Sequence, residues 1–118
     1  MKIFKDFRFE AAHFLPNVPD THQCKRMHGH SYCLRVTVEG KQGETSGWVM
    51  DFGDIKSIVK PVINQLDHQC LNDLEGLENP TAENVAVWIW DQIKKQLPGL
   101  VEIRLNETAS SGCIYNGF

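Results

Sequence analysis

The sequence has no apolar run of about 18 residues, the minimum that a membrane-spanning helix needs, so we expect no membrane partner. It also has no excess of positive charge. Its 12 Lys and Arg stand against 15 Asp and Glu, and a net charge of −3 disfavours nucleic acid as the main partner. The first residues are charged and strand-like rather than typical of a signal peptide, which predicts a cytoplasmic protein.

The sequence lacks any C-x-x-C pair, although it has cysteines at positions 24, 33, 70 and 113. A structural zinc site made of four thiolates is therefore disfavoured, and we expect free thiols in a reducing compartment. Cys33, Cys70 and Cys113 are interpreted as small packing residues. Cys24 alone lies close in sequence to candidate metal ligands.

No linker, repeat or low-complexity segment divides the chain, so its 118 residues predict one domain over 1–118. Alternating and helical periodicities predict the order strand, strand, strand, helix, helix, strand. The strands are expected over 2–14, 28–39, 48–50 and 100–108, and the helices over 51–66 and 81–97.

The two predicted helices have clear start signals. Asp51 and Thr81 are each well placed to cap a first turn. Pro61 lies inside the first helix, where it removes a hydrogen bond and predicts a kink. Trp90 falls outside the apolar stripe of the second helix, so we expect it to face a neighbouring subunit.

Three histidines are placed to share one site. His28 and His30 lie on the core face of their predicted strand, because side chains two residues apart point to the same side. His13 ends the apolar row of the first strand. If the two strands share a sheet, the three imidazoles converge, and three protein ligands with one open position are typical of catalytic zinc.

The alternative for each histidine taken singly is a hydrogen-bonded core residue. Only their joint occurrence, with Cys24 in the preceding loop, favours the metal site. His22, which follows Pro19 and Asp20 in the same loop, is expected to be exposed.

Two further polar groups end apolar segments. Glu107 continues the core-facing row of the last strand, where it is either solvated or binds paired N–H donors of a planar heterocycle such as a pterin. Asp67 and His68 end the first helix. They are either an ordinary helix terminus or a pair in which the carboxylate orients the imidazole through the bend of the loop.

Together these motifs resemble the 6-pyruvoyl-tetrahydropterin synthase family over nearly the whole chain. The matching segments, in order, are Glu10-Ala11-Ala12-His13, Cys24-x3-His28-Gly29-His30, Leu66-Asp67-His68, Leu71-Asn72, Asn79-Pro80-Thr81-x-Glu83 and Glu107-Thr108. The short gap between Cys24 and His28 resembles the bacterial branch, the 6-carboxy-5,6,7,8-tetrahydropterin synthases of queuosine biosynthesis. The segment 83–87 resembles the animal enzymes instead.

The resemblance implies an α+β tunnelling fold (T-fold), in which a four-stranded antiparallel sheet carries two helices on one face. It also implies a homohexamer, built as a dimer of trimers whose sheets close into barrels. The predicted order of strands and helices agrees with this fold.

The resemblance further implies a zinc-dependent lyase that converts 7,8-dihydroneopterin triphosphate into 6-carboxy-5,6,7,8-tetrahydropterin, acetaldehyde and triphosphate. The residues that it implies are His13, His28 and His30 as zinc ligands, Cys24, His68 and Asp67 as catalytic groups, and Glu107 and Thr81 as substrate contacts. Lys25 and Arg26 either meet the triphosphate or are simply solvated.

Two other functions remain open at this point. One is a 6-pyruvoyl-tetrahydropterin synthase or a related pterin enzyme on the same scaffold. The other is a non-catalytic module that binds zinc or pterin, which would leave Cys24 and His68 without a role.

Overall fold

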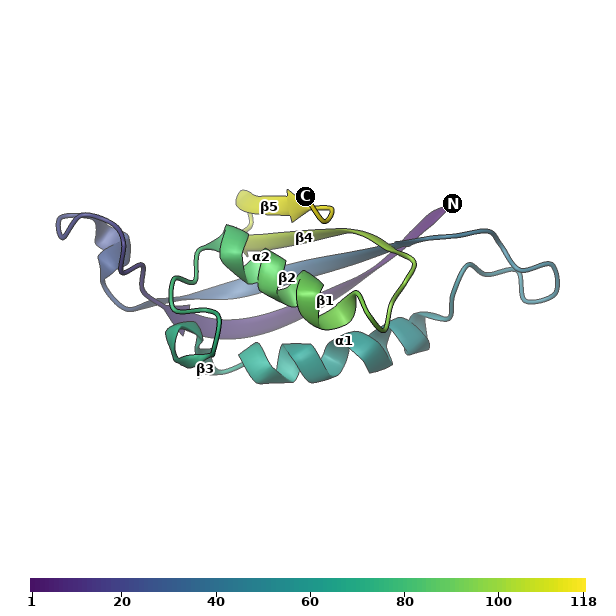
Figure 1. Cartoon of the computed structure of the whole chain (residues 1–118), viewed down its shortest axis with the longest axis horizontal. Coiled ribbons are helices and arrows are strands. Elements are labelled where there is room, and N and C mark those ends of the chain that lie inside the picture. The colour runs from purple at the N-terminus through teal and green to yellow at the C-terminus, as the bar shows by residue number, and fades with distance from the viewer.

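Two helices lie on one face of a five-stranded sheet whose order is β3-β1-β2-β4-β5 (Figure 1). The structure, a computed structural model, describes the whole chain from Met1 to Phe118. Its main elements are β1 (Lys2–His13), β2 (His28–Glu39), α1 (Phe52–Leu66), β3 (Gln69–Cys70), α2 (Ala82–Ile93), β4 (Leu100–Thr108) and β5 (Ser111–Tyr115). Short 3-10 helices occupy Gln23–Lys25 and Leu71–Asp73. The expected α+β class and the two helices on one face are confirmed.

The expected strand count of four is wrong in detail. β3 adds a short parallel strand beside β1 at Ala11 and Ala12, and β5 adds an antiparallel strand beside β4. The strand expected over 48–50 does not form, and these residues belong to the protruding loop between β2 and α1 (Figure 1). Because β1 and β4 already pair with both edges of β2, a returning strand would find no free partner there.

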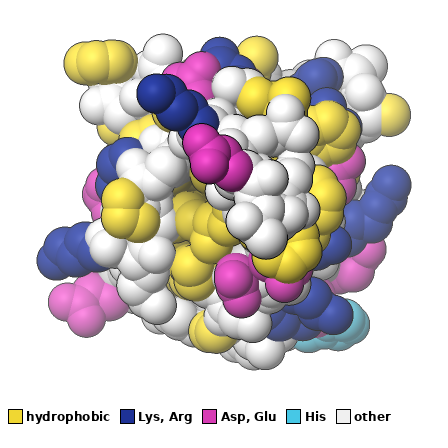
Figure 2. Space-filling view, turned by 90° about the vertical axis from the view of Figure 1, so that its right-hand side faces the viewer, with side chains coloured by type: hydrophobic (Ala, Val, Ile, Leu, Met, Phe, Trp, Pro, Cys, Tyr) yellow, Lys and Arg dark blue, Asp and Glu magenta, His cyan; other side chains and the backbone are white.

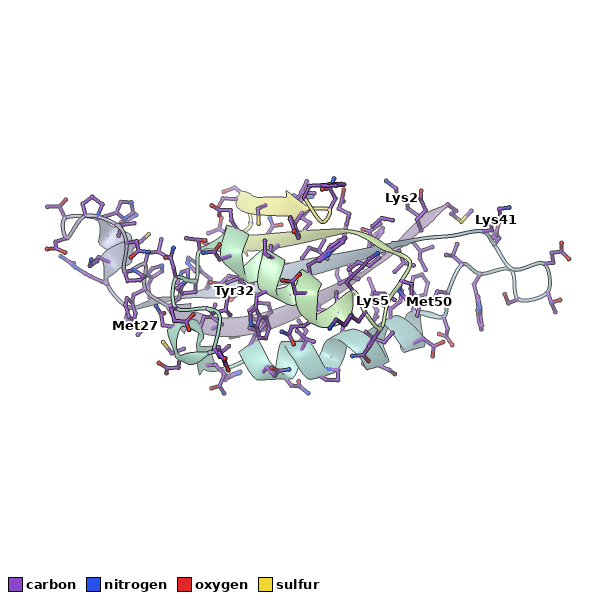
Figure 3. All side chains as sticks on the ribbon, viewed as in Figure 1. Lys2, Lys5, Met27, Tyr32, Lys41 and Met50 are labelled. Carbon is purple, nitrogen blue, oxygen red and sulfur yellow. The ribbon has the colours of Figure 1, made fainter.

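The register of β1 and β2 sets the core. The strands are antiparallel, with Phe9 opposite Tyr32 and His13 opposite His28. The Phe9 and Tyr32 rings stack with their centroids 4.7 Å apart. Tyr32 is completely buried and lies between the sheet and the helices (Figure 3). Alternation then places every second residue of both strands on the helix-covered face.

Both helices begin where the capping residues predict. The Asp51 side chain accepts a hydrogen bond from the Gly53 N–H at 2.8 Å, and Thr81 Oγ1 accepts one from the Asn84 N–H at 3.1 Å. α1 continues through the exposed Pro61 to Leu66. Neither helix combines the length and the apolar character that crossing a membrane would demand.

The expectation that Trp90 faces a neighbouring subunit is wrong. Its side chain is only 9% exposed within this single chain, and its ring meets the Tyr115 ring edge-on at 5.4 Å. Tyr115 belongs to β5, the strand that the sequence did not predict. Trp90 therefore packs inside its own subunit instead of facing a neighbour.

Gly112 permits the tight pairing of β5 with β4. A Cβ atom there would press against the carbonyl oxygen of Leu105 and lie 2.8 Å from the Asn106 Cα. We expect Gly112→Ala to lower the free energy of unfolding by about 1–3 kcal/mol, because rigid backbone must move to admit the methyl group. Urea unfolding measures this. Gly29→Ala is the control, since its Cβ would lie 3.4 Å from the nearest atom. Equal stability of the two variants would contradict the prediction.

Candidate metal centre and active site

Three imidazoles from two neighbouring strands meet at one end of the sheet. His13 ends β1, whereas His28 and His30 begin β2. The ring centroids of His13 and His28 are 4.5 Å apart, and each lies 5.0 Å from that of His30. One nitrogen from each ring lies within 4.8 Å of the other two. The predicted convergence of the three histidines is present.

Backbone carbonyls orient two of these rings. His13 Nδ1 donates to the Pro80 carbonyl at 2.8 Å, and His28 Nδ1 donates to the Arg26 carbonyl at 2.7 Å. A carbonyl can only accept, so Nδ1 of each ring carries the proton and Nε2 keeps its lone pair. Outer partners of this kind are typical of metal-ligating histidines.

Two nitrogens of the cluster are not satisfied by a hydrogen bond within the chain. His13 Nε2 and His30 Nε2 are buried and make no hydrogen bond. Buried polar atoms are normally paired, so two such nitrogens within one cluster fit a site that could hold a metal ion. Burial also lowers the pKa of His13, which keeps the ring in the neutral form that binds metal. A set of three imidazoles suits zinc or another divalent transition metal.

This arrangement bears on both interpretations of His13, as a core residue and as a metal ligand. The residue is 1% exposed and hydrogen-bonded to Pro80, as a core histidine would be. Its second nitrogen remains unsatisfied, however, and faces two more imidazoles. A purely structural role leaves that nitrogen unexplained.

Glu107 lies beside this cluster. Its Oε2 is 3.5 Å from His30 Nε2, and a quarter of its side chain is exposed. It lies where the β4–β5 register shifts between Asn106 and Thr108, so the irregular strand end turns its carboxylate toward the histidines. Glu107 is thus neither fully solvated nor fully buried, and it borders a polar hollow of about 610 Å³ that His30 also lines.

Asp67 and His68 form a connected pair. His68 Nδ1 lies 2.9 Å from Asp67 Oδ2, and the other oxygen of Asp67 accepts the Glu10 N–H at 2.9 Å. That backbone hydrogen bond, followed by the contact with His68, lowers the pKa of Asp67. His68 has a φ of 59°, so the bend of the chain brings its ring back to the preceding carboxylate. The His68 side chain is 78% exposed and lines, with His30, a second hollow of about 520 Å³.

Cys24 lies in the 3-10 helix of the loop between β1 and β2 and is half-buried. Its backbone N–H donates to His22 Nδ1 at 3.0 Å, a local contact that the sequence did not reveal. No hydrogen bond joins the Cys24 thiol to His68 or to the metal-site histidines. The loop extends from one end of the molecule, where Met27 also lies (Figures 1 and 3). His22 itself is exposed, as expected.

Lys25 has a role within this loop. Its ammonium donates to the carbonyls of Pro16 and Val18 at 2.7 and 3.3 Å and lies 3.4 Å from an Asp20 carboxylate oxygen. These contacts hold the loop together. They also occupy the donors that a phosphate would need.

Two features of the site carried no recognisable signal in the sequence. Pro80 and Arg26 act through backbone carbonyls, which every residue has. Asn72 clamps the chain just after His13, because its side chain bonds both the N–H and the carbonyl of Phe14, at 3.0 and 2.8 Å. The Leu71-Asn72 motif contained this residue, but its role was visible only in the fold. Thr81, in contrast, uses its hydroxyl oxygen to cap α2.

The sequence model described as 6-pyruvoyl tetrahydropterin synthase matches residues 2–117. The chain belongs to this family. Membership agrees with the resemblance that the ordered motifs indicate.

Individual members of the family resemble the chain closely. It is 42% identical over 119 residues to a 6-carboxy-5,6,7,8-tetrahydropterin synthase from Synechocystis, covering 96% of this chain and 91% of the relative. It is also 41% identical over 96 residues to a dihydroneopterin monophosphate aldolase from Pyrococcus furiosus, covering 81% and 77%.

A solved family structure has the same fold. The 6-pyruvoyl tetrahydropterin synthase of Caenorhabditis elegans superposes with a TM-score of 0.92 at 27% identity, covering all of this chain and 96% of that one. The chain, with its five-stranded sheet and two helices, therefore has the fold of this solved family structure.

We expect His28→Ala to reduce bound zinc from one ion per chain to near zero, since two imidazoles remain where three are needed. Metal analysis of the purified variant after dialysis measures this. His68→Ala is the matched control, because that histidine lies outside the cluster and should leave the zinc content unchanged. Full zinc content in His28→Ala would exclude His28 as a ligand.

Proposed function

We propose that this chain is a zinc-dependent lyase that converts 7,8-dihydroneopterin triphosphate into 6-carboxy-5,6,7,8-tetrahydropterin, with release of acetaldehyde and triphosphate, in queuosine biosynthesis. The observation that carries the proposal is the cluster of His13, His28 and His30, in which two buried nitrogens make no hydrogen bond. The 42% identity to a relative named for this product supports the choice of substrate.

The three histidines would hold the zinc. When bound, zinc supplies Lewis-acid polarisation of a substrate oxygen. The protein's part is to keep the imidazoles neutral and oriented, which the burial of His13 and the Pro80 and Arg26 carbonyls favour. The hollows that His30 borders give a substrate access to this end of the sheet.

Cys24 and His68 are assigned to proton transfer. Cys24 removes a proton from the substrate side chain as the general base. His68 returns protons as a general acid, held in one tautomer by Asp67. The family resemblance implies sites that lie between subunits, so we assign Cys24 and His68 to different copies of a homo-oligomer. We propose that this assembly is a hexamer of two stacked trimers, as the family resemblance implies.

Glu107 is assigned to the pterin ring. A carboxylate accepts two parallel N–H donors from the guanidine-like edge of a pterin, and each hydrogen bond to a charged group contributes about 1.5–3 kcal/mol. A quarter of the Glu107 side chain is exposed, so a ligand can reach it, and its position beside His30 keeps a bound ring close to the histidine cluster. Thr81 is assigned a lesser contact with the ring.

Incubation with 7,8-dihydroneopterin triphosphate and mass spectrometry of the products tests the function. The proposal requires 6-carboxytetrahydropterin together with acetaldehyde. A pyruvoyl side chain on the product would instead support 6-pyruvoyl-tetrahydropterin synthase activity. Binding of the pterin without any turnover would support the non-catalytic module.

A second candidate rests on the Pyrococcus furiosus relative, whose name describes an aldolase for dihydroneopterin monophosphate. Its identity to this chain, 41%, is nearly that of the Synechocystis relative. Parallel assays with the monophosphate and the triphosphate separate the two candidates. The first proposal requires faster turnover of the triphosphate.

We expect Cys24→Ala to keep its zinc and fold but to lose turnover by about 10²- to 10⁴-fold, the usual contribution of a general base. Steady-state kinetics and metal analysis on the same preparation measure both properties. Cys113→Ala is the matched control, because it removes a thiol that packs against the core instead. This variant should keep the wild-type activity. Undiminished turnover of Cys24→Ala would remove Cys24 as the base.

A further inference from the structure

Three arginines line one hollow on the outer face of the sheet, opposite the helices. The chain has only four arginines, and Arg8, Arg35 and Arg104 border the hollow of about 610 Å³ that also includes His30 and Glu107. The chain as a whole carries a net charge of −3. Basic and acidic side chains are intermixed on the end of the molecule shown in Figure 2. Three of the four arginines thus gather beside the candidate active site, although the chain as a whole is negatively charged.

The strand registers create this cluster. Asp6 lies opposite Arg35, and Arg35 in turn lies opposite Arg104. The next row holds Arg8 opposite Cys33. Like charges directly opposite one another destabilise a sheet, so the Arg35–Arg104 pair costs stability without a compensating contact between them. Local rules are most often broken at functional sites.

Only one of the three arginines has a counter-charge. Arg35 binds Asp6 through two hydrogen bonds of 2.8 and 3.0 Å, and its guanidinium lies 3.8 Å from the Phe4 ring centroid. Arg104 makes one hydrogen bond, to the neutral Asn106 amide oxygen at 3.1 Å. Arg8 makes no hydrogen bond or ion pair. Two guanidinium groups in the hollow are therefore free to bind an anion.

We propose that Arg8 and Arg104 bind the oligophosphate chain of a phosphorylated substrate. This inference rests on the proposed function, because it assigns a place to the triphosphate of that substrate. Guanidinium groups bind phosphate oxygens in a bidentate manner. A ligand whose ring meets Glu107 can extend its phosphates along the same hollow toward these arginines. Lys25 is excluded from this role by its contacts within its own loop.

Calorimetry on the zinc-loaded full chain tests the site with three probes: inorganic triphosphate, 7,8-dihydroneopterin triphosphate and unphosphorylated 7,8-dihydroneopterin. We expect Arg8→Gln and Arg104→Gln each to weaken binding of both phosphorylated probes by about 10- to 100-fold. Binding of 7,8-dihydroneopterin should stay unchanged. Lys56→Gln, which removes one exposed positive charge from α1, is the control and should bind all three probes as wild type does.

Glu107→Gln should give the opposite pattern, because it alters the ring contact and leaves the arginines in place. It should weaken binding of 7,8-dihydroneopterin and retain that of inorganic triphosphate. Arg104→Lys, which keeps the charge, should restore part of the affinity that Arg104→Gln loses.

The outcomes separate this inference from the proposed function. If wild type processes no pterin but loses inorganic triphosphate binding in both arginine variants, the anion site stands and the proposed function fails. If wild type forms the carboxylated product and both variants bind every probe normally, the arginine site is overturned. The site is also overturned if the variants lose 7,8-dihydroneopterin equally or change their oligomeric state, since the arginines would then support the fold or a contact between copies.

Discussion

Everything at the candidate site depends on the antiparallel pairing of β1 with β2 in one register. That register sets His13 opposite His28 and Ala11 opposite His30, so three imidazoles share one face at one end of the sheet. If the register of β2 slipped by one residue, His28 and His30 would point to the other face of the sheet, and the cluster would be lost. The stacked rings of Phe9 and Tyr32, directly opposite each other, fix the register from within the core. Packing and function therefore rest on the same pairing.

The histidines are then oriented by parts of the chain that are distant in sequence. Pro80 lies just before α2, yet its carbonyl holds the ring of His13. Asn72 secures the chain at Phe14, and the bend at His68 is attached to β1 through Glu10. These segments connect the helices to the same end of the sheet. The helices thus cover the core, and the segments that connect them to the sheet provide fixed polar groups around the three histidines.

The two faces of the sheet serve different purposes at this end. The helix-covered face supplies the imidazoles, whose burial favours the neutral form. The outer face has no helix over it and carries Arg8, Arg35 and Arg104, of which only Arg35 is paired with an acid. Glu107 and His30 lie where the hollow meets the histidine cluster. The hollow therefore joins the histidine cluster to the outer face of the sheet.

Much of this was readable before the fold was known. Period-two alternation predicted the two long strands and the face that His13, His28 and His30 share, because strand geometry fixes side-chain direction. Asp51 and Thr81 predicted both helix starts, since their side chains supply the missing hydrogen-bond acceptors of a first turn. The ordered motifs likewise indicated the family. These features are local, or are repeated regularly along the chain.

Only the tertiary structure decided the rest. β3 has two residues, too few to give a periodic signal, and it forms because the chain after α1 passes beside β1. β5 exists because Gly112 lets the chain fold closely onto β4, and it covers Trp90, which its own helix pattern left outside the apolar stripe. The roles of the Pro80 and Arg26 carbonyls cannot be predicted from residue type, because every residue has a backbone carbonyl. The sequence by itself determined which side chains could act together; the meeting of distant backbone segments decided how they are held, because those contacts depend on position in space.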